Sequence, residues 1–387
     1  MRKVCVITAT RAEYGLLKPV IDLIKQSKEL ELQLCVTGAH LSPEFGLTYQ
    51  EIVEDGNPIT AKIEMLMSSD TSVGITKSMG SFLFGLADFY EVNKPDIIII
   101  LGDRYEMLVA ASAAMIAKIP IAHIGGGEIT EGAYDDAIRH SITKMSQLHF
   151  ASTEEYKNRI IQLGEQPDRV HNVGALGVEN IKKITLWSRE QLEEDLQFTL
   201  GDKLIIVTYH PVTLDDIPSK VQFANLLCVL DKYKDIRVIF TKANADTDGR
   251  IINKMIDEFV EKNRDRCIAF SSLGQIRYLS VLQFCKAVVG NSSSGIIEAP
   301  SFHIPTVNIG NRQQGRIAAR TIVHCGYEIE NIEEAIKKVL KDEFQMTVKK
   351  YINPYEGKNT SQRIVNEIEK FLRKENSIKK KFYDIMR

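Results

Sequence analysis

The sequence predicts an α/β protein made of two doubly wound domains with a cleft between them. Short apolar runs alternate with helix-length amphipathic segments throughout the chain. This alternation stops over residues 179–201, which are polar, charged and poor in strand formers, and then starts again. Many of the apolar runs end in turns that carry charged or hydroxyl side chains, and open α/β sheets bind ligands at the carboxyl ends of their strands.

The first domain is expected to cover residues 1–178. The helices expected there lie at 14–27, 76–90, 105–118 and from about 137 onward. The strands expected there are the runs at 3–8, 32–37, 97–101, 120–124, 148–151 and 170–173.

The second domain is expected to cover residues 179–360, with helical patterns between its strands. A last helix and a basic tail, 361–387, are expected to pack back on the first domain. The strands expected in the second domain are the runs at 204–208, 237–241, 267–270, 287–289 and 306–309.

Composition excludes several classes of protein. The chain has 387 residues, of which 44% are hydrophobic and 26% charged, and a net charge of -2, so it is expected to be soluble, without a nucleic-acid or membrane partner. Its six cysteines show neither CxxC pairs nor zinc spacing, and the start lacks a signal-peptide pattern, which favours reduced thiols in the cytoplasm. The longest apolar run, 107–124, is broken by Lys118 and Pro120 and predicts a helix and a strand rather than a membrane span.

Two carboxylates follow neighbouring strands of the first domain. Asp103 comes after the run 97–101, and Glu128 comes after the run 120–124. The helix between these strands makes them parallel, so both turns lie at one edge of the sheet. A third acidic position, Asp135 with Asp136, stands just before a helix that contains Arg139 and His140. Three carboxylate positions are therefore expected on one rim.

A serine-rich turn follows a strand of the second domain. In GNSSSGIIEAPSF, residues 290–302, small residues would let backbone N–H groups and the hydroxyls of Ser293 and Ser294 approach a phosphate at a helix start. The alternative is an ordinary serine-capped helix with Glu298 placed favourably near its N-terminus. Local pattern leaves both interpretations open. Neither GxGxxG nor a P-loop is present, so no dinucleotide cofactor is expected.

Other strand ends carry side chains that suit an anionic ligand, although each one taken singly has a structural explanation. These side chains are Arg11, His210, Asn244 with Asp246, and Arg312 with Arg316. That five separate strand ends carry Arg, Asp, Glu, His or a serine-rich turn favours a shared site.

The motifs as a set resemble the hydrolysing UDP-N-acetylglucosamine 2-epimerases of bacterial sialic and legionaminic acid biosynthesis. The resemblance rests on GDRYEM, the GGE of HIGGGEITEGAYDDAIRHSITK, the HP of TYHPVT, GNSSSGIIEAPS and NIGNRQQGR. It implies a GT-B-type fold, a homodimer, and a reaction without metal or NAD that converts UDP-GlcNAc and water to ManNAc and UDP through 2-acetamidoglucal. A related subgroup acts on a UDP-2,4-diacetamido-2,4,6-trideoxyhexose, and several stretches of the chain fit either subgroup.

The resemblance also implies roles for residues. Asp103, Glu128 and Asp135 match the catalytic acid and base groups, with Asp136 the weaker match, and His210 matches a histidine near the leaving phosphate. The positions that match the UDP site are Arg11, Asn244, Ser293, Ser294, Gly295, Glu298 and Arg312.

Three further functions are weighed against hydrolysis. The non-hydrolysing epimerases have a Gln-rich pattern where this chain reads TGAHLSPEFG, so hydrolysis is favoured. A GT-B glycosyltransferase would share the fold but would need an acceptor pocket more than three acids. A non-catalytic nucleotide-sugar sensor would not need the acids at all.

Overall fold

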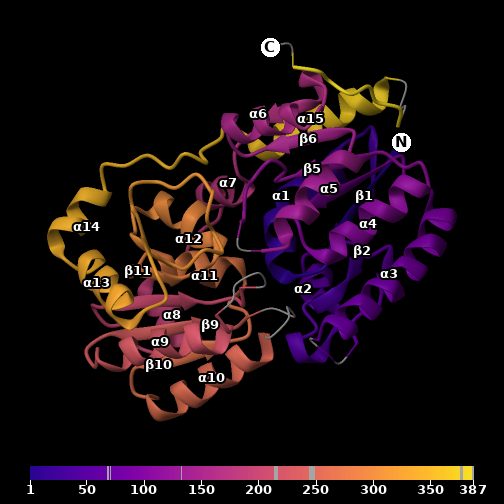
Figure 1. The fold of residues 1–387 in the computed structure, drawn as a ribbon. Coiled ribbons are helices and arrows are strands. Elements are labelled where there is room, and N and C mark those ends of the chain that lie inside the picture. Colours follow the sequence, from indigo (N-terminus) through magenta and orange to yellow (C-terminus); the bar gives the residue numbers. More distant parts are fainter. Residues whose placement is uncertain are drawn as a thin grey trace. The chain divides into compact units, whose positions relative to one another are not determined.

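The computed structural model describes residues 1–67, 69, 71–131, 133–212, 217–243, 249–374 and 378–385. The chain forms two compact units (Figure 1). The first unit contains Met1–Glu128, Asp135–Asn180 and Tyr355–Arg387, and the second contains Ile129–Tyr134 and Ile181–Pro354. A short segment that follows Glu128 in sequence therefore belongs to the second unit, and the C-terminal helix belongs to the first.

The first unit is built on a parallel sheet of seven strands in the order β3-β2-β1-β4-β5-β6-β7. Its central strands are apolar on both faces because helices cover both faces, as parallel sheets require. The strands are β1 (Arg2–Thr8), β2 (Leu30–Thr37), β3 (Ala61–Ile63), β4 (Ile97–Leu101), β5 (Ile121–Ile124), β6 (Leu148–Ala151) and β7 (Val170–Asn172).

Seven α-helices and three short 3₁₀ helices are described for this unit, and the last α-helix returns from the far end of the chain. The α-helices are α1 (Arg11–Gln26), α2 (Tyr49–Glu54), α3 (Ser72–Asn93), α4 (Tyr105–Ile116), α5 (Asp135–Met145), α6 (Glu154–Gln162) and α15 (Thr360–Arg373); α7 (Leu176–Lys183) spans the boundary between the units. The 3₁₀ helices are η1 (Gly38–Leu41), η2 (Pro43–Phe45) and η3 (Pro167–Arg169).

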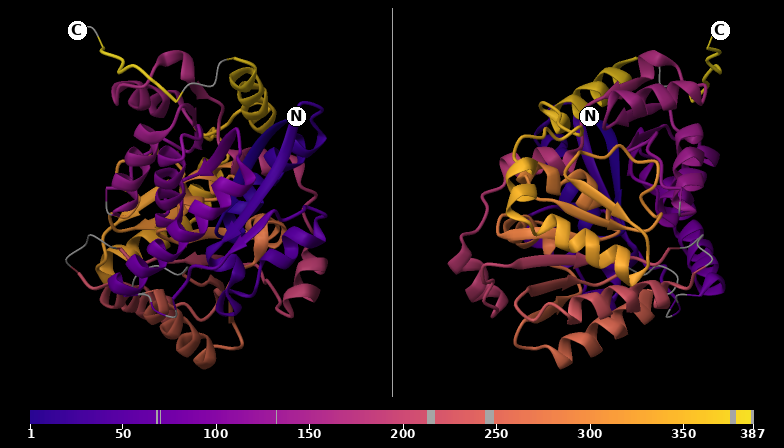
Figure 2. Two further views of the ribbon diagram at one scale, coloured as in Figure 1. Left: turned by 90° about the vertical axis from the view of Figure 1, so that its right-hand side faces the viewer. Right: turned by 60° about the vertical axis from the view of Figure 1, so that its left-hand side comes forward.

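Helix α15 packs on α1, and Figure 2 shows this yellow helix close to the indigo N-terminal segment. Its apolar residues Ile364, Ile368 and Phe371 join the core of the first unit. The hydroxyl of Ser27 donates to the Glu369 carboxylate at 2.8 Å. The last helix is thus part of the first unit's core.

The second unit has a parallel sheet of six strands in the order β10-β9-β8-β11-β12-β13 and its own hydrophobic core. The strands are β8 (Leu204–Thr208), β9 (Arg237–Thr241), β10 (Cys267–Phe270), β11 (Cys285–Gly290), β12 (Thr306–Ile309) and β13 (Ile322–Cys325). The helices are α8 (Arg189–Leu196), α9 (Ser219–Asp231), α10 (Gly249–Lys262), α11 (Gly274–Leu282), α12 (Ser293–Ile297), η4 (Ala299–Phe302), α13 (Ile329–Val339) and α14 (Asp342–Val348).

The predicted fold class, two doubly wound α/β units, is confirmed. Two short strands, β3 and β13, were not expected because three or four residues at a sheet edge leave a weak apolar pattern. Helix α5 begins at Asp135, two residues before the predicted start, so the acidic pair forms its first turn. All six cysteines are free thiols. Within the described ranges, no helix is long and apolar enough to cross a membrane.

Candidate active site

The carboxyl ends of β4 and β5 carry the two carboxylates on glycine turns. Gly102, with φ +79°, precedes Asp103, and Gly125 and Gly127, with φ +86° and +78°, precede Glu128. A Cβ on Gly127 would lie 2.3 Å from the Tyr156 carbonyl oxygen, so only glycine fits this close approach. The turns therefore place both carboxylates at one edge of the sheet, as the sequence predicts.

Arg139 of α5 connects the acidic groups of this rim. Its side chain is 1% exposed and forms an ion pair with Asp103. Its second terminal nitrogen donates to Asp136 Oδ1 at 3.1 Å and to the Glu128 carbonyl oxygen at 3.0 Å. A buried guanidinium that contacts both carboxylates fixes their positions. The sequence prediction gave Arg139 no such role, although its spacing of three residues from Asp136 places both on one helix face.

Glu128 lies beside a hydroxyl donor, and Asp135 stands at the start of a helix. Glu128 is 7% exposed, and its Oε1 accepts a hydrogen bond from the Ser152 hydroxyl at 3.1 Å. Asp135 is the first residue of α5 and is partly exposed. The structure therefore brings Asp103, Glu128 and the Asp135–Asp136 pair to one rim of the first unit.

A second buried acid, absent from the sequence prediction, lies at the start of α1. Glu13 accepts hydrogen bonds from the backbone N–H groups of Ala9 and Thr10 at 2.9 and 3.2 Å. Burial raises the pKa of Glu13 to about 7, against the opposing charge of Arg104. This carboxyl group caps α1, and its capping box with Thr10 is visible in the sequence as a Thr followed three residues later by Glu.

Arg11 lies in the first turn of the same helix. Its guanidinium forms a two-contact ion pair with Glu51, one contact being Nε to Oε2 at 2.7 Å. In this structure Arg11 is thus held within the first unit by a carboxylate.

In the second unit, Asn291 ties three strand ends together. Asn291 is fully buried; its Oδ1 accepts from the His210 N–H at 2.7 Å and its Nδ2 donates to the His210 carbonyl oxygen at 2.8 Å. Its own carbonyl oxygen accepts from Arg312 at 3.1 Å and from Gln313 at 2.8 Å. His210 and Arg312, which the sequence places 102 positions apart, are therefore held by one buried residue.

The serine-rich turn begins a serine-capped helix, as one of the two interpretations of its sequence expects, and its role as an anion site stays a prediction. Ser292 is the N-cap of α12, with its hydroxyl accepting from Ser294 N–H at 3.4 Å. Glu298 is the C-cap of this five-residue helix, so its expected placement near the helix N-terminus is wrong. The Ser294 hydroxyl donates to Glu298 and contacts the Tyr278 hydroxyl at 2.6 Å. Burial raises the pKa of Glu298, which the Ser294 hydrogen bond opposes.

Ser293 is partly exposed in the first turn of α12, and Gly295 lies two residues after it. A Cβ on Gly295 would lie 2.8 Å from Thr306 Cγ2, so this glycine lets α12 pack closely on β12. Asn244 and Asp246 lie outside the described residues. Among the described His, Cys, Asp and Glu side chains, no group of three is arranged to hold a metal ion.

Comparison with known proteins identifies the family. Residues 22–369 match the family model described as UDP-N-acetylglucosamine 2-epimerase. The chain belongs to this family. As a member of the UDP-sugar 2-epimerases it is an enzyme, which argues against a non-catalytic sensor and against a glycosyltransferase.

Two curated relatives are similar over most of the chain. A "GDP/UDP-N,N'-diacetylbacillosamine 2-epimerase (hydrolyzing)" from Campylobacter jejuni is 45% identical over 344 residues, 89% of each chain. The "Polysialic acid biosynthesis protein P7" of Escherichia coli is 36% identical over 387 residues, which cover 100% of this chain and 98% of the relative.

The fold is also shared with solved structures of 2-epimerases. The UDP-GlcNAc 2-epimerase of Neisseria meningitidis, solved bound to UDP-GlcNAc, superposes with a TM-score of 0.79 at 22% identity, covering 95% of this chain and 100% of that one. The two parallel sheets with alternating helices thus match the GT-B-like fold of this epimerase family.

Proposed function

We propose that this epimerase hydrolyses UDP-N,N'-diacetylbacillosamine with inversion at C2, releasing UDP and the free 2-epimeric diacetamido sugar. The observation that carries the proposal is the 45% identity, over 89% of both chains, to a relative named for this hydrolysing reaction. One water is consumed for each UDP released. The C2 proton and UDP leave first, giving a 2-acetamidoglycal, and water then adds to the double bond with a proton delivered to C2.

The residues of the two units suit different parts of this reaction. Loss of the C2 proton needs a positioned base, and addition of water needs an acid and a base, roles that we assign to Asp103, Glu128 and Asp135. Departure of UDP needs cations and hydrogen-bond donors at the diphosphate. We assign this binding to Ser293, Ser294, Gly295, Glu298 and Arg312 of the second unit, with Arg11, Asn244 and His210.

A second candidate substrate is UDP-GlcNAc, which would give ManNAc. It is supported by the family description and by the motifs in the sequence. The two substrates share the UDP group and the 2-acetamido group and differ at C4 and C6, so the same acids would serve either reaction.

The test is an acceptor-free assay of the purified enzyme with UDP-N,N'-diacetylbacillosamine, its GDP counterpart and UDP-GlcNAc, in EDTA and without NAD. We expect NMR to show the free 2-epimeric sugar and UDP in equal amounts, fastest from the diacetamido substrate. If ManNAc is released from UDP-GlcNAc faster than the diacetamido sugar is released from its substrate, UDP-GlcNAc is the preferred substrate. A nucleotide-linked 2-epimer as sole product, or activity only after a divalent ion is returned, would contradict the hydrolytic, metal-independent reaction.

Replacing both Ser293 and Ser294 with Ala is expected to raise the UDP dissociation constant roughly tenfold or more, given about 1 kcal/mol for each hydrogen bond and more with a charged partner. Calorimetry with UDP measures the change. Ser188→Ala is the control, because Ser188 lies at the start of α8 in the same unit and is not assigned to the UDP site. An unchanged dissociation constant in the double variant would remove these serines from the UDP site.

We also propose a cytoplasmic homodimer that pairs through the face formed by α3 and α4, which lie side by side (Figure 1). This face bears Phe84 and Ile116, 81% and 78% exposed, and a groove of about 750 Å³. Charges of both signs, Glu91 and Lys118, line the groove, so two copies related by a twofold axis can present opposite charges to each other.

Light scattering coupled to size exclusion tests this interface. Phe84→Glu is expected to convert the dimer to a monomer, because it places a charge in an apolar contact. Val53→Glu, which changes an exposed apolar residue of α2 in the same unit, should remain dimeric. A Phe84→Glu variant with the mass of a dimer would exclude this face.

A further inference from the structure

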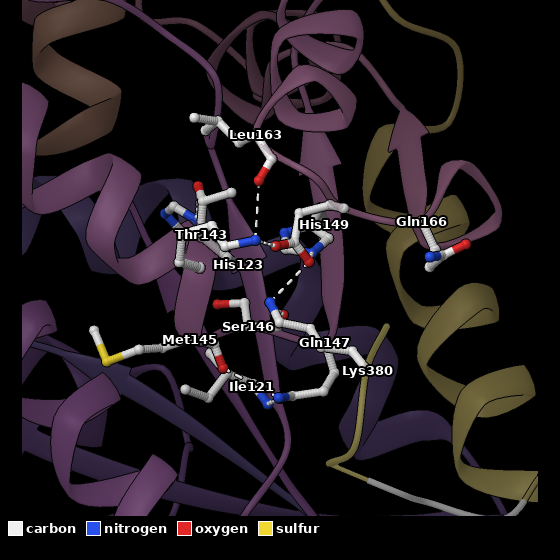
Figure 3. Close-up of polar contacts among 12 residues, drawn as sticks. Ile121, His123, Thr143, Met145, Ser146, Gln147, His149, Leu163, Gln166 and Lys380 are labelled. Carbon is white, nitrogen blue, oxygen red and sulfur yellow. Dashed lines mark hydrogen bonds and ion pairs between the residues drawn. The ribbon is translucent and has the colours of Figure 1, made fainter. Parts of the chain in front are cut away.

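Two buried histidines lie beneath the acidic rim of the first unit. His123 is on β5 and His149 is its register partner on the neighbouring strand β6, and both are fully buried. Figure 3 shows the two imidazoles on adjacent strands. Neither imidazole is one of the acidic groups of the rim. The contacts of each ring therefore indicate its role.

His123 holds the turn that carries Asp103. Its Nε2 lies 2.9 Å from the carbonyl oxygen of Gly102, the residue directly before Asp103. A carbonyl oxygen can only accept, so Nε2 carries the proton. In the neutral ring Nδ1 is then an acceptor, and the Thr143 hydroxyl donates to it at 3.2 Å. Burial lowers the pKa of His123 to about 3, so the ring keeps this single neutral tautomer near neutral pH.

The same ring lies against the loop that leads to Glu128. A Cβ on Gly126 would lie 3.2 Å from His123 Nδ1 and 3.1 Å from Thr143 Oγ1, tighter than ordinary contact. This glycine therefore lets the loop rest directly on the imidazole and the hydroxyl. His123 thus supports both of the turns that end in a carboxylate.

The C-terminal tail completes the layer behind the histidines. His149 Nε2 lies 3.1 Å from Glu165, whose side chain is 2% exposed. Lys380 of the tail donates to Glu165 at 2.7 Å and to the Ser146 carbonyl oxygen at 2.8 Å. Figure 3 shows Lys380 close to Ser146 and His149. Burial alone would raise the pKa of Glu165, but hydrogen bonds from His149, Lys144 and Lys380 lower it to about 2, so it is a carboxylate.

The tail is seated by more than this one lysine. The backbone N–H of Tyr383 donates to the Gly164 carbonyl oxygen at 2.8 Å. A Cβ on Gly164 would meet the Phe382 ring at 2.3 Å, so the glycine makes room for that ring. Residues 378–385 are therefore fitted to the loop that carries Glu165.

We propose that His123 is a positioning residue for the Asp103 turn, and that the C-terminal tail keeps this imidazole in place through Glu165 and His149. The inference rests on the proposed catalytic role of Asp103. It means that kcat depends on a residue that does not contact the substrate, His123, and on the C-terminal tail.

The main test compares His123→Phe, similar in size but without a donor, with His123→Gln, whose amide N–H can still donate. His123→Phe is expected to lower kcat roughly 10- to 100-fold, as misplaced catalytic groups do, with KM and the UDP dissociation constant within about twofold of wild type. The kcat of His123→Gln should be at least about fivefold higher than that of His123→Phe. Equal kcat in wild type and His123→Phe, per folded molecule, or no difference between Phe and Gln, would overturn the proposal.

Two further variants extend the test. Thr143→Val keeps the ring and removes the hydroxyl that donates to its Nδ1. It replaces His123→Phe if that variant does not fold, and a fall in kcat of about threefold or more is expected. Lys380→Met is compared with Lys381→Met, because Lys381 is the exposed neighbour in the same tail. Only Lys380→Met should lower kcat; equal effects would exclude the tail from the role.

Hydrogen exchange separates this inference from the proposed function. Amides in peptides covering residues 99–107 and 125–130 should exchange faster in His123→Phe than in wild type, whereas peptides covering 285–291 should not change. If wild type turns over no nucleotide sugar, the proposed function fails, and the exchange data still decide whether His123 holds the turns. Unchanged exchange at 99–107 would overturn the positioning role.

Discussion

Asp103→Asn is expected to lose on the order of 10² to 10⁴ in turnover, the range typical of a general acid or base, while it still folds and binds UDP. The amide keeps the size of the side chain but cannot take up a proton at that oxygen. UDP affinity should persist because the residues proposed to bind UDP lie mainly in the second unit. Turnover is measured by UDP release, and UDP affinity by calorimetry.

Asp136→Asn is the matched control, because Asp136 shares the Arg139 guanidinium with Asp103. We expect it to lose less than about tenfold, since one carboxylate still faces Arg139 and the proton-transfer group remains. An equal loss in both variants would mean that the rate depends on the charge beside Arg139 and not on proton transfer by Asp103.

Turnover in deuterium oxide and hydration of added 2-acetamidoglycal show which step each acid serves. Elimination followed by hydration predicts that product formed in deuterium oxide carries deuterium at C2, since the proton returned comes from solvent. A variant that stalls only elimination should still hydrate added 2-acetamidoglycal. Product with only protium at C2 would exclude the scheme, and with it the roles assigned to Asp103, Glu128 and Asp135.

Gly290→Ala is expected to destabilise the second unit by roughly 2–6 kcal/mol, the sum of a backbone conformation that side chains rarely adopt and a core overlap. Gly290 has φ +133°, and a Cβ there would lie 2.0 Å from the carbonyl oxygen of Thr208 on the adjacent strand. Backbone atoms of a central strand cannot move aside without breaking the sheet. Because Asn291 follows directly, the hold on His210 should also be lost.

Trp187 is the only tryptophan of the chain and lies in the second unit, so its fluorescence follows urea unfolding of that unit. Gly295→Ala is the control, and it is expected to lower the free energy of unfolding by less than Gly290→Ala does. Its Cβ would meet a side-chain methyl group of Thr306 at 2.8 Å, which can shift, so a loss of about 1–2 kcal/mol is expected. A Gly290→Ala midpoint equal to that of wild type would contradict the close approach at this turn.

Much of the fold follows from the sequence alone because parallel strands are buried on both faces. Runs such as 97–101 and 204–207 are continuously apolar, and they lie in central strands of the two sheets. Crossover geometry then places the residues after each strand at one edge. For this reason Asp103 and Glu128 could be assigned to the same rim before any contact was known.

Only the tertiary structure decided which side chains meet at those edges. The ion pair of Arg139 with Asp103 joins positions 36 apart, and the hold of Asn291 on His210 joins positions 81 apart. Such contacts depend on strand order and on the rotation of each helix, which local patterns do not encode. The support of the Asp103 turn by His123 was hidden for the same reason: a histidine inside an apolar strand shows its partner only when the neighbouring strand is in place.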